Sequence, residues 1–87
     1  MQLVYFSSLF CEPCIQTRYV LDQVVALVPA AELLEYDVAM EPDVAEASDI
    51  RVTPTVVVRA ADGGEVFRAE GVPTVNQVLV ALARAVS

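Results

Sequence analysis

Two cysteines that are separated by two residues, Cys11 and Cys14, follow almost directly on the apolar, β-rich run of residues 2–6. Beyond them, apolar residues recur with helical spacing as far as about residue 28, where Pro29 stops the pattern. The pair therefore stands where a buried strand passes into a helix. A helix N-terminus has unpaired N–H groups and a partial positive charge, which favour a thiolate. This placement predicts a redox pair, with Cys11 as the nucleophile and Cys14 as the resolving thiol.

Two other uses of a cysteine pair compete with this interpretation. The cysteines could be buried and inert, or they could bind a metal ion. One C-x-x-C supplies only two ligands, whereas structural zinc takes four. The sequence has no histidine and no third cysteine, so a metal site would need carboxylates or a second chain. We therefore expect no metal.

The remaining pattern predicts one α/β domain over residues 1–87. Strands are expected at residues 2–6, 33–38, 55–59 and 65–69, with a hairpin turn at 62–64. Helices are expected from Cys11 or Cys14 to about 28, from 41 to about 48, and from Thr74 onward, where Gln77 completes a capping box. The apolar stripe of the last helix is predicted at Val75, Val78, Leu79, Leu82 and Val86.

The charge of the chain excludes several kinds of partner. Twelve acidic residues stand against five arginines and no lysine, which gives a net charge of −7. Nucleic acids and anionic membranes are bound through basic clusters, so neither is expected as a partner. The sequence opens without a basic region or cleavage site and has no apolar run of about 20 residues. A cytoplasmic location is expected.

Beyond these patterns, the residues resemble the thioredoxin family along almost the whole chain. Cys11-Glu12-Pro13-Cys14 looks like the family's Cys-Gly-Pro-Cys, and Phe10 stands where the family usually has Trp. Residues 50–55 resemble the segment in which the family has a cis proline, here Pro54. The resemblance implies a minimal thioredoxin fold, β-α-β-α-β-β-α, with a four-stranded mixed sheet and helices on both faces.

The resemblance also implies a protein disulfide reductase that works by dithiol–disulfide exchange. Its substrates would be disulfide-containing proteins, and its electron donor an external flavoenzyme of the thioredoxin-reductase kind. A monomer without a bound cofactor is expected. The substrate would be bound by Phe10, Glu12 and Pro13, and by the backbone of Thr53 beside a cis Pro54. For Phe10, ordinary core packing is the alternative.

Four departures from the family pattern bear on the site. The family's N-terminal strand and helix are missing. Tyr5 stands where the family has a buried acid, and Tyr19 where it has a kinking proline. Glu12 lies between the cysteines. Its charge opposes the Cys11 thiolate by about 1 kcal/mol, while the helix terminus favours the thiolate by a similar amount. We therefore expect a reducing, thioredoxin-like couple.

Two other functions remain open from the sequence. The first is a glutaredoxin-like enzyme that uses glutathione. Only Arg18 and Arg51 could bind the two carboxylates of glutathione. The second is a redox-inert or sensory module that keeps the fold for protein recognition. Reduction of glutathione mixed disulfides distinguishes the first from a reductase, and an insulin reduction assay distinguishes the second.

Overall fold

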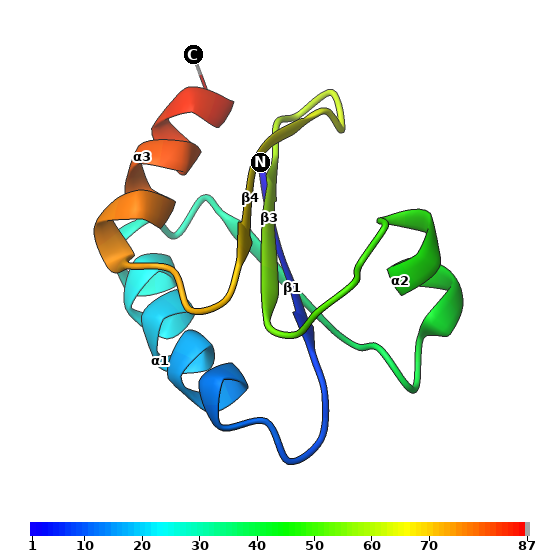
Figure 1. The fold of residues 1–87 in the computed structure, drawn as a ribbon. Helices are drawn as coiled ribbons and strands as arrows, with labels where there is room; N and C mark the ends of the chain where they lie inside the picture. Colours follow the sequence, from blue (N-terminus) through cyan, green and yellow to red (C-terminus); the bar gives the residue numbers. More distant parts are fainter. Residues whose placement is uncertain (87) are drawn as a thin grey trace.

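Four strands form one mixed sheet in the order β2-β1-β3-β4. The computed structural model describes residues 1–86, and Figure 1 shows the arrangement of its elements. In chain order these are β1 (Gln2–Ser7), α1 (Glu12–Leu27), β2 (Glu32–Asp37), α2 (Pro42–Ala47), β3 (Thr55–Arg59), β4 (Glu65–Glu70) and α3 (Val75–Ala85). This is the predicted order, and the element ends lie within two residues of the predicted ones.

The connections give the sheet its mixed character. Strand β1 pairs in parallel with β2 across the α1 crossover, and antiparallel with β3. Strands β3 and β4 form the predicted antiparallel hairpin. The register pairs Ser7 with Asp37, so β1 extends one residue beyond its apolar run. Backbone pairing, to which a polar residue contributes as well as an apolar one, sets that end.

Helices cover both faces of the sheet, as predicted. In Figure 1, α1 and α3 lie on one side of the sheet and α2 on the other. Alternate residues of β1 therefore serve two cores. Leu3 and Tyr5 pack in the larger cluster, with residues of α1 and α3, whereas Val4 and Phe6 pack in the smaller one against Ala45 of α2. Burial of both faces explains why the central strands read as continuous apolar runs.

Helix α1 carries the cysteines and is anchored by its inner face. Leu21 and Val24 are fully buried in the larger cluster, and Val25 and Val28 are partly buried against it. Tyr19, at the position of the family's kinking proline, is exposed, and α1 is one helix from Glu12 to Leu27. Among residues 1–86, no helix combines the length and apolar composition needed to cross a membrane.

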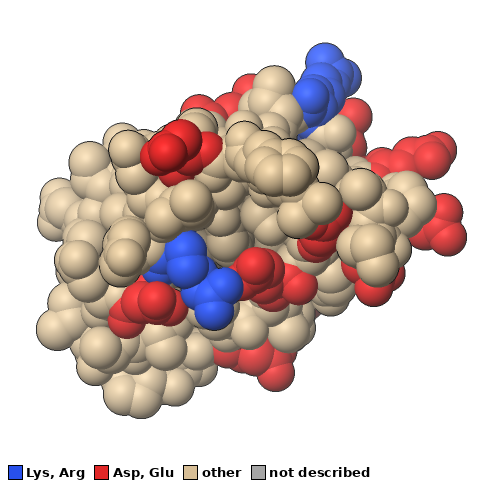
Figure 2. All heavy atoms as spheres, turned by 90° about the horizontal axis from the view of Figure 1, so that it is seen from below, with Lys and Arg blue, Asp and Glu red and all other residues tan. Residues whose placement is uncertain are grey.

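Helix α2 presents its acidic residues to solvent. Asp43 and Glu46 are exposed, and so are the flanking Glu41 and Asp49. Acidic side chains gather on the right-hand side of Figure 2, the side that α2 occupies in Figure 1. The guanidinium of Arg68 in β4 donates to the carbonyls of Ser48 and Asp49 at 2.7 and 3.2 Å, which satisfies acceptors just after this short helix.

Helix α3 begins with the predicted capping box. The Thr74 hydroxyl accepts the Gln77 N–H at 3.1 Å, and the Gln77 side-chain oxygen accepts the Thr74 N–H at 2.9 Å. Val78 and Leu82 of the predicted stripe are buried. The prediction for Val86 was wrong, because α3 ends at Ala85 and Val86 lies beyond the face that meets the sheet, 68% exposed.

Replacing the capping hydroxyl should weaken the fold measurably. Thr74→Ala removes an acceptor for a helix N–H, and we expect it to lower the free energy of unfolding by about 1 kcal/mol. Urea denaturation of the oxidised protein measures the change. Thr74→Ser keeps the acceptor and serves as the control, so equal losses in the two variants would contradict the capping role.

Candidate active site

The loop between β1 and α1 places both cysteines at one end of the sheet. Phe10 adopts a positive φ of 56°, and Cys11 follows in an extended conformation as the N-cap of α1. Pro13 lies in the first turn, where a missing N–H leaves no helix hydrogen bond unmade. The Phe10 side chain is fully exposed, so the alternative of core packing was wrong for this residue.

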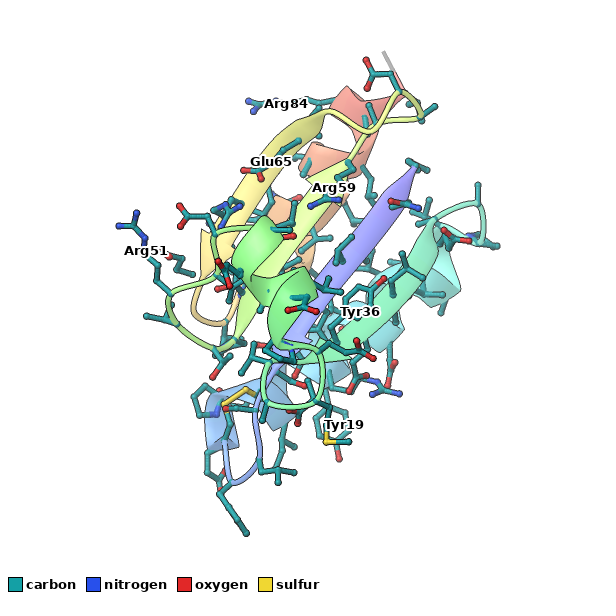
Figure 3. The ribbon with its side chains drawn as sticks, turned by 90° about the vertical axis from the view of Figure 1, so that its right-hand side faces the viewer. Tyr19, Tyr36, Arg51, Arg59, Glu65 and Arg84 are labelled. Atoms are coloured by element: carbon teal, nitrogen blue, oxygen red, sulfur yellow. A yellow bond between two sulfur atoms is a disulfide. The ribbon has the colours of Figure 1, made fainter. Side chains whose placement is uncertain are left out.

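Cys11 and Cys14 form a disulfide, and the structure therefore describes the oxidised form. Figure 3 shows this bond at the end of the sheet where α1 begins. The two sulfur-bearing residues differ in exposure, since Cys11 is partly exposed whereas Cys14 is 4% exposed. The Cys14 N–H also points at the Cys11 sulfur, with a nitrogen–sulfur distance of 3.2 Å. Cys11 is thus the sulfur that a second molecule can reach.

The peptide bond between Thr53 and Pro54 is cis, as the resemblance implied. Hydrogen bonds hold this segment on both sides. The Thr53 and Ser8 hydroxyls lie 2.7 Å apart, which joins it to the loop that leads to Cys11. On the other side, the Gly71 N–H donates to the Pro54 carbonyl at 2.9 Å. Ser8 is a linking residue that the sequence did not single out.

Tyr5 reaches the active-site helix from the middle of β1. It is buried in the core, and its hydroxyl donates to the Cys14 carbonyl at 2.5 Å. Burial, and next the negative charge of Glu35, raise the pKa of the Tyr5 hydroxyl above its usual value of 10.0, while Arg18 acts weakly in the opposite direction. Tyr5 is therefore a neutral donor at neutral pH, where the family has an acid.

Removing this hydroxyl should have two consequences for stability. Tyr5→Phe loses one buried hydrogen bond, and we expect the free energy of unfolding to fall by about 1 kcal/mol. The raised pKa means that the folded state resists ionisation of Tyr5 while the unfolded state permits it. Ionisation of Tyr5 should therefore leave the free energy of unfolding unchanged below about pH 10. Above that pH, it should lower the free energy of unfolding of the native protein.

Denaturation of the oxidised protein from pH 8 upward tests this pair of expectations, since the bonded cysteines do not titrate. The difference between the native protein and Tyr5→Phe should shrink above about pH 10. Tyr36→Phe is a matched control, because the Tyr36 hydroxyl has no hydrogen-bond partner among residues 1–86 and its ring stacks on Phe6. A constant difference across the whole range would contradict the buried-phenol argument.

An open groove of about 950 Å³ runs along α1 beside the disulfide. The β1–α1 loop, the outer face of α1 and the end of β2 form its walls. Of the predicted site residues, it brings together Phe10, Cys11, Glu12 and Cys14, whereas Pro13, Thr53 and Pro54 do not line it. The groove is a feature that the sequence did not predict, because it depends on the packing of α1 against β2.

Arg18 lies in this groove between two carboxylates. Its guanidinium pairs with Glu35 across the groove and with Asp22 one turn along α1, where the nitrogen–oxygen distance is 3.4 Å. Arg51, the other candidate for binding glutathione, points away from the body of the molecule in Figure 3 and lies 3.4 Å from Asp49. Neither arginine is left without an acidic partner.

The architecture matches known structures. The thioredoxin of Fasciola hepatica superimposes with a TM-score of 0.82 at 24% identity, over 97% of this chain and 79% of that one. Thioredoxin 1 of Thermosipho africanus gives 0.84 at 17% identity, over 99% and 94% of the two chains. This chain has the thioredoxin fold. Oxidised mitochondrial thioredoxin 3 of Saccharomyces cerevisiae agrees, with a TM-score of 0.82 at 21% identity over 94% and 76%.

The likeness is one of structure rather than of sequence. No protein-family model matches the sequence, and no curated protein is significantly similar to it. Within this thioredoxin fold, residues 1–86 contain no group of three or more His, Cys, Asp or Glu side chains that is arranged to hold a metal ion.

Proposed function

We propose that this chain is a thiol–disulfide oxidoreductase that reduces protein disulfides. One observation carries the proposal: the disulfide joins a partly exposed Cys11, which caps α1, to a buried Cys14. The exposed sulfur can meet a substrate, and the helix terminus stabilises it as a thiolate. The thioredoxin fold supports the same activity.

The reaction runs in two exchange steps. The Cys11 thiolate attacks one sulfur of the substrate disulfide, the substrate S–S bond breaks, and the departing thiolate takes a proton from water. Cys14, as a thiolate, then attacks the Cys11 sulfur and releases the second substrate thiol. The substrate gains two electrons, and the Cys11–Cys14 disulfide of the structure is formed.

Substrate contacts are assigned to both sides of Cys11. On one side, the Thr53 backbone beside cis Pro54 is proposed to pair with an extended substrate segment. On the other side, the exposed Phe10 ring gives apolar contact, and Glu12 and Pro13 form the surface between the cysteines. The hydrogen bond between Ser8 and Thr53 supports a joint role, because it ties the two sides together.

Each turnover requires two electrons from outside the chain. A flavoenzyme that reduces the Cys11–Cys14 disulfide is the proposed donor, and a cytoplasmic location forms part of the proposal because a reductase needs a reducing compartment. We propose that the chain acts as a monomer. Glutathione is the weaker candidate donor, because Arg18 is already paired with two carboxylates.

Insulin reduction tests the proposal. Catalytic amounts of the chain, recycled by dithiothreitol, should precipitate the insulin B chain well ahead of dithiothreitol alone. No acceleration would overturn the proposal in favour of a redox-inert binding module. Equilibration with glutathione then separates the donors: a potential near about −270 mV indicates a flavoenzyme, and one near about −200 mV indicates glutathione.

A further inference from the structure

The groove beside the disulfide has an apolar rim that faces solvent. Leu9, Ile15 and Tyr19 line it with 73, 57 and 68% of their surface exposed. Ile15 and Tyr19 lie one turn apart on α1 and Leu9 lies in the β1–α1 loop, and we call these three side chains the apolar strip of the groove. An apolar strip that adjoins a reactive disulfide is suited to hold a side chain of the molecule that reacts there.

The charged residues of the groove are mostly acidic. Glu12, Asp22, Glu35 and Asp37 line it, and Arg18 is the lone base among its lining residues. Because Arg18 pairs with both Asp22 and Glu35, its charge is already compensated. Figure 2, which views this end of the molecule, shows acidic side chains around a largely uncharged surface with few basic groups. The groove therefore combines apolar contact with a negative potential.

We propose that this groove binds the part of a substrate next to its disulfide and selects segments that carry an apolar side chain together with Lys or Arg. The inference rests on the proposed function and names its substrate class. Basic polypeptide disulfides are preferred to acidic disulfides, and glutathione disulfide belongs to the acidic group. The acidic groove and a basic substrate segment have complementary charges, which favours this occupant. A second copy of the chain fits the groove poorly, because it brings the same net charge of −7.

Matched peptides test the preference. Four short peptides share one internal disulfide and differ only beside one half-cystine, where they carry Leu-Lys, Leu-Glu, Ser-Lys or a neutral Leu-Gln pair. The reduced protein is mixed with each, and the second-order rate constant is measured at about 20 mM and about 0.5 M ionic strength. At low salt, we expect Leu-Lys to react roughly tenfold faster than Leu-Glu. That ratio should approach one at high salt, and Leu-Lys should exceed Ser-Lys at both.

A charge reversal inside the groove locates the effect. Asp22→Lys changes the groove charge and should lower the Leu-Lys to Leu-Glu ratio several-fold. Glu32→Lys is the matched control, because it makes the same change of net charge at the far end of β2 from the site. The ratio within each variant is compared, so any general change in reactivity cancels. Ile15→Ser tests the apolar strip and should reduce the advantage of Leu-Lys over Ser-Lys.

The outcomes separate the two proposals. If even the neutral peptide is not reduced, the proposed function itself fails. If the neutral peptide is reduced but Leu-Lys and Leu-Glu react equally at low salt, the groove inference alone is overturned. It is also overturned if Glu32→Lys lowers the ratio as much as Asp22→Lys, since net charge rather than the groove would then set the preference.

Discussion

Cys11→Ser should reduce insulin reduction to the background rate of the reductant alone, because a serine hydroxyl cannot form a disulfide with the substrate. Cys14→Ser should act differently. Its Cys11 thiol still attacks, but nothing resolves the product, so a one-to-one mixed disulfide with the substrate should accumulate. Turnover assays measure the first effect, and mass spectrometry of the non-reduced protein measures the second.

The pair of variants also provides its own control. Both lack the Cys11–Cys14 disulfide, so any difference between them reflects the roles of the two sulfurs rather than loss of the crosslink. Their folding is compared with that of the reduced native protein, which lacks the crosslink as well. Continued turnover by Cys11→Ser, or mixed disulfides that form equally in both variants, would contradict Cys11 as the nucleophile.

Leu21→Ala should cause the largest loss of stability among the substitutions considered. Leu21 is fully buried in the larger core cluster and fixes the inner face of α1 against the sheet. Truncating such a side chain costs about 2–5 kcal/mol, a large share of the roughly 5–15 kcal/mol that stabilises a domain. Because 1 kcal/mol shifts the Tm of a domain this small by about 4–8 °C, the Tm should fall by at least about 8 °C.

Leu27→Ala is the control on the same helix. Leu27 is 65% exposed, so the same change of side chain should alter the free energy of unfolding by no more than about 0.5 kcal/mol. Thermal denaturation of the oxidised proteins compares the two. Similar losses for Leu21→Ala and Leu27→Ala would show that helix propensity, rather than packing of α1 on the sheet, determines the stability of this element.

Most of the fold could be predicted from the sequence because its local signals agreed with one another. The cysteine pair after an apolar strand, the Thr74–Gln77 capping box and the glycines of the hairpin each predict a local structure, and each was confirmed. The cis bond before Pro54 was inferred from the family resemblance rather than from local physics. Local chemistry thus gave the elements and their order.

What the sequence could not supply are contacts between residues far apart in the chain. The ion pair between Arg18 and Glu35 joins α1 to β2, and the hydrogen bond from Tyr5 to the Cys14 carbonyl joins β1 to α1. Both depend on the exact seating of the helix on the sheet. One signal was available: Tyr5 shares a strand face with Leu3, and that face had to meet the helix that begins at the cysteines.

The strand order β2-β1-β3-β4 makes β2 and β4 the edge strands of the described sheet. An edge strand offers unpaired backbone N–H and C=O groups to another extended chain and so promotes aggregation. Strand β2 carries Glu32, Glu35 and Asp37, and β4 begins and ends with Glu65 and Glu70. Glu35 and Glu65 are paired with Arg18 and Arg68, so Glu32, Asp37 and Glu70 supply the charge that repels a second edge of the same kind. Glu35 and Asp37, which line the groove, thus belong to a wider pattern of carboxylates along both edge strands, and this pattern disfavours edge-to-edge pairing of a chain rich in valine.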